Sequence, residues 1–282
     1  MKLGIGTVQF GCNYGISNKT GQVSIKEVSK ILNYAQENKI DTLDTACMYG
    51  NSEEVLGKFD LSPFKVITKT IRANNRETVD YNVKNLERNF LNSLENLRQA
   101  SIYGLLFHEA NDLIFNLGDA LWAKVEEFKR KKYVDKIGVS VYTPEQLIQI
   151  IDKFDIDIVQ LPLNILDQRF VYLMKELKSK GIEIHTRSTF LQGLLLMKND
   201  EINPYFDEIK PLLNQIPEPK LSYALQYVNS LSEVDKIIVG TTSLNDLKEI
   251  IESNNKKIVD IDYNIFKIDD EKFLMPQNWR LK

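Results

Sequence analysis

Cysteine and histidine are scarce in this sequence, and long apolar runs are missing. Two cysteines and two histidines among 282 residues provide neither a disulfide framework nor a set of metal ligands, so we expect a reducing compartment and no metal. No apolar run approaches the length of a membrane-spanning helix, and the first residues, MKLGIGTVQF, lack the apolar core of a signal peptide. We therefore expect a cytoplasmic protein that does not enter a membrane.

The charged residues show no excess of one sign. Lysine and arginine total 36, aspartate and glutamate total 39, and both signs are interspersed, which argues against binding to nucleic acid or to a membrane surface. No linker rich in glycine, proline or serine divides the chain. With 43% hydrophobic residues the sequence can bury a sizeable core, and we expect a single domain over residues 1–282. The sequence gives no indication of the oligomeric state.

Apolar and β-branched runs alternate with segments of helical period from one end of the chain to the other. Ser24 and Glu27 have the spacing of a capping box at a helix start, and Thr143, Pro144 and Gln146 predict another start. Eight runs are predicted as strands, at residues 3–10, 42–46, 65–70, 102–107, 136–141, 156–161, 182–186 and 236–239.

Strands that are apolar on both faces and are each followed by a helix require a parallel sheet covered on both sides. Eight such repeats over this length favour a closed (β/α)8 TIM barrel of the α/β class over an open sheet. No GxGxxG motif follows the first predicted strand, which argues against the open dinucleotide-binding sheet. The stretch 199–219 has little period and several prolines, and is predicted as a loop with partial helix on the barrel rim.

Four polar residues stand at or just past the ends of three successive predicted strands. Asp44 and Tyr49 lie in DTLDTACMYG, Lys69 ends FKVITK, and His108 ends IYGLLFH. In a barrel these strand ends converge on one face. A tyrosine is a poor acid at neutral pH, but a neighbouring Lys69 would lower its pKa, and Asp44 would hold that ammonium in place. His108 would orient a carbonyl oxygen or relay the proton.

Each of these residues also has an ordinary structural interpretation. An aspartate at a strand end is usually a turn residue, a lysine there is usually solvated, and a tyrosine beside a glycine usually lies on a rim. A lone histidine is more often structural than catalytic. Their occurrence in order on consecutive strands favours the catalytic interpretation, in which the four residues form a site for proton transfer.

In this order and setting the four residues resemble the catalytic tetrad of the aldo-keto reductases. The segment LDTACMYGNSEEVLGK is similar to the family pattern D-T-A-x-x-Y-G-x-S-E-x-x-L-G. The resemblance continues through LGIGTVQFG, GVSVY, IVQLPLNILDQR, STFLQGLL and IIVGTTSLNDLKEI, and so covers nearly the whole chain. It implies an oxidoreductase that uses NADPH or NADH to reduce a small aldehyde or ketone, with Tyr49, Asp44, Lys69 and His108 as catalytic residues.

The resemblance also implies contacts with the cofactor and the substrate. Ser140 and Gln160 would hydrogen-bond the nicotinamide carboxamide, and the segment after residue 239 would donate to the cofactor phosphate ahead of a helix N-terminus. The C-terminal tail often folds over the barrel mouth in this family, so Tyr14 and Trp279 are candidates for the substrate site. The residues implied for the cofactor are Ser140, Gln160, Arg187, Ser188, Leu191, Gly240, Thr241, Thr242 and Asp246.

Several positions depart from the family pattern, among them Ile250, which takes the place of an asparagine that often contacts adenine. Val141 replaces an asparagine, which removes one carboxamide contact. Arg187 stands where many members stack a tyrosine on the nicotinamide; a guanidinium there can stack, bind an anionic group on the substrate, or pair with a rim acid. Asp246 is in register with an arginine that clamps the 2′-phosphate of NADPH, and a carboxylate there would repel that phosphate. We therefore predict reduced discrimination between the cofactors and use of NADH.

The substrate is not encoded in a recognisable way, although the polar rim and Arg187 favour a sugar-like or anionic carbonyl compound. One alternative is a nicotinamide-binding sensor or regulatory subunit with little turnover. A weaker alternative is a barrel lyase or epimerase in which Lys69 forms a Schiff base. The neighbouring Asp44 would keep Lys69 protonated, which disfavours that chemistry.

Overall fold

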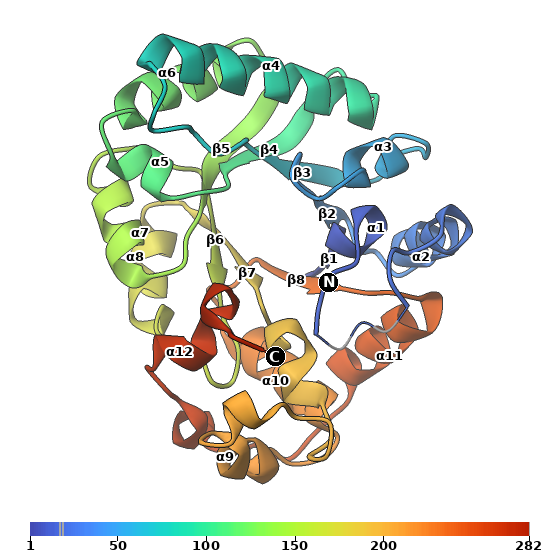
Figure 1. The fold of residues 1–282 in the computed structure, drawn as a ribbon. Coiled ribbons are helices and arrows are strands. Elements are labelled where there is room, and N and C mark those ends of the chain that lie inside the picture. Colours follow the sequence, from blue (N-terminus) through green and yellow to red (C-terminus); the bar gives the residue numbers. More distant parts are fainter. Residues whose placement is uncertain (17, 19, 282) are drawn as a thin grey trace.

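The computed structural model describes residues 1–16, 18 and 20–281. Eight parallel strands pair in chain order, and β1 also pairs with β8, so the sheet closes into a barrel. Figure 1 shows the strands at the centre and the helices around them. The predicted (β/α)8 barrel is confirmed. The strands are β1 (Leu3–Gly6), β2 (Thr42–Asp44), β3 (Lys65–Lys69), β4 (Ile102–Phe107), β5 (Val134–Ser140), β6 (Ile158–Pro162), β7 (Glu183–Arg187) and β8 (Lys236–Gly240).

The helices connect these strands and cover the outside of the barrel. They are α1 (Val8–Gly11), α2 (Ile25–Glu37), α3 (Ser52–Leu56), α4 (Val79–Leu97), α5 (Asn111–Ile114), α6 (Gly118–Arg130), α7 (Pro144–Ile151), α8 (Met174–Ser179), α9 (Lys210–Gln215), α10 (Lys220–Ser230), α11 (Leu244–Asn255) and α12 (Glu271–Leu274). Short 3-10 turns are η1 (Val171–Leu173), η2 (Leu191–Leu196), η3 (Pro204–Phe206), η4 (Tyr263–Phe266) and η5 (Pro276–Asn278). In the part of the chain that the structure describes, no helix is long and apolar enough to cross a membrane.

The two predicted helix starts are both present, but they are built differently. At α7, Thr143 accepts a hydrogen bond from the backbone of Gln146, whose side chain accepts in return from the backbone of Thr143, a complete capping box. At α2, Ser24 accepts from the backbone of Glu27, but the Glu27 carboxylate accepts from the backbone N–H of Leu244 at 2.8 Å. Glu27 therefore caps α11 as well as belonging to α2.

The first predicted strand, residues 3–10, is too long. The chain leaves the sheet after Gly6, whose register partner Asp44 is the last residue of β2, so no ladder is available beyond that point. Val8–Gly11 instead turns into the short helix α1, in which the Cys12 N–H donates to the Val8 carbonyl at 3.0 Å. This turn brings the segment after β1 over the barrel mouth.

The polar residues of the barrel mouth share a strand face with a small apolar cluster. Ile67, Leu106 and Ile158 form this cluster, which is separate from the larger core between strands and helices. Side chains two residues apart in a strand point to the same face. Lys69, His108 and Gln160 each follow a cluster residue by two positions, and the strand geometry therefore stacks them on the cluster at the C-terminal end of the barrel. 

Candidate active site

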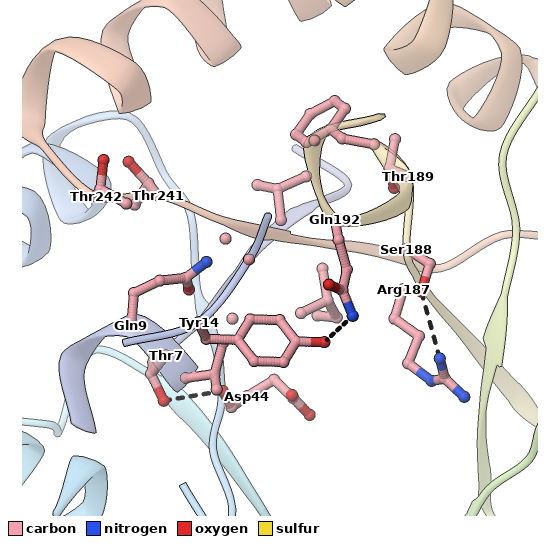
Figure 2. Close-up of a pocket in the computed structure, with 18 of the residues that line it drawn as sticks. Thr7, Gln9, Tyr14, Asp44, Arg187, Ser188, Thr189, Gln192, Thr241 and Thr242 are labelled. Atoms are coloured by element: carbon pink, nitrogen blue, oxygen red, sulfur yellow. Dashed lines mark hydrogen bonds between the residues drawn. The ribbon is translucent and has the colours of Figure 1, made fainter. Parts of the chain in front are cut away.

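A cavity of about 700 Å³ lies at the C-terminal end of the barrel. Its lining comes from the last residues of β1, β2 and β5 to β8 and from the loops that follow them. Figure 2 shows part of this lining, with Thr241 and Thr242 at one side of the pocket and Arg187 at the opposite side. The size is in the range of sites for small molecules and cofactors, and the position is the one at which barrel enzymes place their active sites.

A buried ion pair lies at the centre of the barrel mouth. Lys69 Nζ is 2.6 Å from Asp44 Oδ2 and also donates to the Thr45 carbonyl at 2.9 Å, and the two side chains are only 1% and 5% exposed. Gln160 Nε2 donates to the other carboxylate oxygen of Asp44 at 2.7 Å. Burial opposes the charge on Lys69, but the adjacent Asp44 carboxylate outweighs it and raises the pKa of Lys69. Lys69 is therefore a stable cation.

Tyr49 and His108 lie beside this pair in the cavity lining. Lys69 Nζ is 4.9 Å from the centroid of the Tyr49 ring, and the His108 ring meets the Tyr49 ring edge-on at a centroid distance of 5.7 Å. Burial, reinforced by the charges of Lys69, Arg72 and Arg187, lowers the pKa of His108 to about 3, so the imidazole is neutral at physiological pH. The structure thus brings the four predicted catalytic residues together.

The expected effect of Lys69 on Tyr49 is only partly present. Burial is the largest influence and raises the pKa of Tyr49, while the charge of Lys69 acts in the opposite direction and is outweighed. The predicted lowering by Lys69 is therefore present, but it does not bring the net pKa of the phenol below its usual value. The phenol is protonated, and the ammonium is placed to stabilise the phenolate once a proton has left.

Two glycines allow the loop that carries Tyr49 to lie against α1. A Cβ atom on Gly11 would stand 1.7 Å from the Tyr49 carbonyl oxygen, and a Cβ on Gly50 would stand 2.3 Å from the Gly11 carbonyl oxygen. Gly50 also has a positive φ of 57°, which glycine adopts without strain. Any larger residue at either position would force the Tyr49 loop away from α1.

A hydroxyl network fixes the backbone around the ion pair. Ser52 Oγ donates to the Thr7 carbonyl at 2.9 Å and accepts from Thr45 Oγ1 at 3.1 Å, and Thr7 Oγ1 donates to the Asp44 carbonyl at 3.0 Å. All four residues are buried. The network therefore holds both the strand end that carries the carboxylate and the residue whose carbonyl accepts from Lys69.

The side of the cavity near β8 carries carboxylates where the resemblance implied phosphate contacts. Asp246 Oδ2 accepts from both the backbone N–H of Thr242 at 3.0 Å and its hydroxyl at 2.5 Å. The Leu244 N–H is occupied by Glu27, and Glu249 also lines the cavity. The Thr242 donors that were expected to hold a phosphate are thus directed to Asp246. Gly240 and Thr241 remain in the lining.

The other residues implied for the cofactor are distributed unevenly. Ser140, Gln160, Arg187 and Ser188 line the cavity, and the Gln160 amide nitrogen is directed to Asp44. Leu191 is fully buried in the core and is not among the lining residues.

The two aromatic residues expected at the substrate site lie in different surroundings. Tyr14 lines the cavity, and its hydroxyl accepts from Gln192 Nε2 at 3.2 Å (Figure 2). Trp279 is not among the lining residues, because its indole N–H donates to the Phe273 carbonyl at 3.0 Å and its ring packs against Phe206 at a centroid distance of 4.9 Å. The tail therefore packs on the segment 204–206.

Gln9 and Tyr142 are site residues that the sequence analysis did not single out. Gln9 Oε1 is buried with no hydrogen-bond partner among the described residues, and the side chain lies against Gly240, where an added Cβ would be 2.8 Å from Gln9 Nε2. Tyr142 stacks on the Arg187 guanidinium at 4.2 Å. Both lie within three residues of the end of a strand, which is the available sequence signal.

The residues of this cavity fit a nicotinamide cofactor. Gly240 has no side chain that would cover its backbone. The unpaired Gln9 oxygen beside it can accept a hydrogen bond from a hydroxyl group. His108 Nδ1 is also buried without a partner in the part of the chain that the structure describes. These polar atoms gain partners if a polar ligand fills the cavity.

Comparisons with known proteins agree with this fit. The sequence model of the aldo/keto reductase family matches residues 2–270. Structures with the same fold include aldo-keto reductase AKR11C1 from Bacillus halodurans in its holo form, with 19% identity, a TM-score of 0.74, and coverage of 92% of this chain and 88% of that chain. The glycerol dehydrogenase AKR11B4 from Gluconobacter oxydans has 17% identity, a TM-score of 0.68 and coverage of 92% and 88%.

A candidate aldo-keto reductase from Pseudomonas aeruginosa is also similar in fold, with 20% identity, a TM-score of 0.69, and coverage of 90% of this chain and 89% of that chain. A search among curated protein sequences finds no match. At these identities the solved structures establish the fold, whereas the family model spans nearly the whole barrel. The chain belongs to the aldo/keto reductase family and is an NAD(P)-dependent oxidoreductase.

Proposed function

We propose that this protein reduces an aldehyde or ketone to an alcohol, with Tyr49 as the proton donor. The observation that supports this proposal is the buried Asp44–Lys69 pair beside the Tyr49 ring, with His108 at the edge of the same ring and all four residues at one cavity. A carbonyl oxygen placed in that cavity meets a protonated phenol whose conjugate base has a cation at hand.

Each residue then has a distinct role. The hydride for the carbonyl carbon would come from a nicotinamide cofactor held by Ser140, Gln160 and the residues after β8. The Tyr49 hydroxyl gives its proton to the carbonyl oxygen as negative charge develops there, and the Lys69 ammonium stabilises the resulting phenolate. Asp44 keeps Lys69 charged and in place. His108 is neutral and orients the carbonyl oxygen by a hydrogen bond, without adding a second positive charge to the site.

The cofactor would be held by residues on both sides of the cavity. Ser140 and Gln160 would bind the carboxamide, with the Gln160 nitrogen already directed to Asp44 and its oxygen left to accept. Gly240, Thr241 and Gln9 would contact the phosphates.

The side of the cavity near β8 favours a cofactor without a ribose 2′-phosphate. Asp246, Glu249 and Glu27 are carboxylates at or beside the start of α11. Two of them already accept from the backbone N–H groups that a ribose 2′-phosphate would need, and like charges repel. We therefore propose that NADH is used with an efficiency comparable to that of NADPH.

The reduction of para-nitrobenzaldehyde by NADH, followed by absorbance, tests the proposed function. Tyr49→Phe should lower kcat by roughly 10²- to 10⁴-fold, the range that a positioned acid contributes. Tyr81→Phe, the same change at an exposed position of α4, should have no effect. Cofactor binding without turnover of this or other carbonyl compounds would instead indicate a sensor or regulatory protein. Because the pKa of Lys69 is raised, no observation favours a Schiff base at that residue.

A further inference from the structure

Arg187 is a cation in the active-site cavity without an acidic partner. None of the ion pairs among the described residues includes it, and none of the acids that line the cavity bonds to it. Lys69, by contrast, is neutralised by Asp44. Arg187 is also the only lysine or arginine among the described residues that line the cavity. The rim acid that the sequence left open as its partner is therefore not present in the described part of the chain.

The guanidinium is held in place by contacts that do not use its charge. It stacks on the Tyr142 ring at 4.2 Å, Nη2 donates to the Val141 carbonyl at 2.9 Å, and Nη1 donates to Ser188 Oγ at 3.3 Å. Those two bonds use two of the five N–H donors of an arginine, so each terminal nitrogen retains a second N–H. A fixed, half-buried guanidinium with unused N–H donors is suited to binding a carboxylate or a phosphate.

A second donor lies on the same part of the rim. The Tyr14 hydroxyl accepts from Gln192, which leaves its own O–H proton available to another acceptor. A tyrosine hydroxyl keeps its proton at neutral pH, and Tyr14 lies close enough to Arg187 for the two side chains to interact electrostatically. Figure 2 shows the hydrogen bond between Gln192 and Tyr14, and it shows Arg187 across the pocket from Thr241 and Thr242. Arg187 is thus remote from the expected cofactor-phosphate contacts.

We propose that Arg187, assisted by Tyr14, binds an anionic group of the substrate, so that the enzyme prefers aldehydes or ketones that carry a carboxylate or a phosphate. This inference rests on the proposed carbonyl reduction. The tetrad takes the carbonyl oxygen, and the guanidinium takes the anion at the other end of a small molecule. The charge-assisted hydrogen bonds formed there select the charged compound over its neutral analogue.

Matched pairs of substrates test the preference. para-Carboxybenzaldehyde and para-carbamoylbenzaldehyde carry planar substituents of nearly the same size, and they differ in charge. Wild-type protein should show a ratio of kcat/KM for the carboxylate over the amide on the order of 10- to 100-fold. Arg187→Met should bring this ratio close to one, Arg187→Lys should recover part of it, and Arg130→Met, the same charge change at an exposed position of α6, should leave it unchanged.

A second pair, glycolaldehyde phosphate and glycolaldehyde, distinguishes the anion: the pair with the larger ratio identifies phosphate or carboxylate as the preferred group. Ratios near one for both pairs in the wild type would overturn the proposal while leaving carbonyl reduction intact. An equal loss for charged and neutral compounds in Arg187→Met, with a raised KM for NADH, would also overturn it, because Arg187 would then serve the cofactor.

Calorimetric titration with terephthalate, in the presence of NADH, provides a readout that does not require turnover. The anion site is supported if the wild type and Arg130→Met bind terephthalate and Arg187→Met does not. If this result is obtained but no aldehyde is reduced, only the proposed reduction fails. If the wild type neither binds terephthalate nor reduces an aldehyde, the anion site and the proposed reduction are both overturned. Thermal unfolding of each variant verifies that it is folded.

Discussion

Replacing Lys69 with methionine should leave the Asp44 carboxylate buried without a counter-charge. In the folded protein Lys69 Nζ lies 2.6 Å from that carboxylate, and the two side chains are 1% and 5% exposed, so water cannot take the place of the ammonium. The Gln160 amide would remain as a single neutral donor. Removing one partner of a buried ion pair costs about 3–5 kcal/mol of stability. For a protein of this size that corresponds to a decrease in Tm of roughly 6–10 °C.

The same reasoning predicts strong coupling between the two positions. Asp44→Asn alone should cost a similar amount, because it leaves the ammonium unpaired. The double variant Lys69→Met/Asp44→Asn carries neither charge, so its loss of stability should be no greater than that of either single variant, with a coupling free energy of about 3 kcal/mol or more. Urea unfolding followed by circular dichroism measures all three variants. Losses that simply add would refute the account of a mutually dependent buried pair.

The active-site cavity yields two further predictions. Asp246→Arg should raise the ratio of kcat/KM for NADPH over NADH on the order of 10- to 100-fold, because a cation replaces the carboxylate that accepts from Thr242. Glu252→Arg, at an exposed position of the same helix, should leave this ratio unchanged. Steady-state kinetics with both cofactors measures the ratio. His108 stays neutral in the folded protein down to a pH of about 3, whereas in the unfolded chain it takes up a proton below about 6.5. This one residue should therefore contribute a loss of roughly 2 kcal/mol of stability to the wild type between pH 7 and 5. His108→Gln should lose less over that range in urea unfolding, and equal losses would contradict the assigned burial of the imidazole.

Local patterns in the sequence were sufficient to predict the barrel and the four catalytic candidates. Apolar runs mark the strands and show where each one ends. A closed barrel brings the C-terminal ends of its eight strands to one face, so Asp44, Lys69 and His108 meet when the barrel forms. The first strand was predicted too long because Val8 and Phe10 are as apolar as strand residues. What ends the strand is the end of its neighbour at Asp44, which lies 38 residues away from Gly6 in the sequence.

The features that the sequence did not predict depend on contacts between residues that are far apart in the chain. Glu27 has the spacing of a capping box, and nothing local shows that its carboxylate reaches Leu244, which is 217 residues away. The hydrogen bond from Gln160 to Asp44 likewise crosses the barrel. The balance between burial and the charge of Lys69 at the Tyr49 hydroxyl depends on how completely the site excludes water, and this is a property of the packed structure.

The proposed function requires that the cavity bind a nicotinamide cofactor and that Tyr49 supply the proton. Fluorescence titration of the purified protein with NADPH and then NADH, repeated for Tyr49→Phe and combined with the aldehyde assay, tests it directly. Both cofactors should bind with similar affinity, Tyr49→Phe should retain this binding, and carbonyl reduction should be lost in that variant. Failure of both cofactors to bind, or undiminished reduction by Tyr49→Phe, would contradict it.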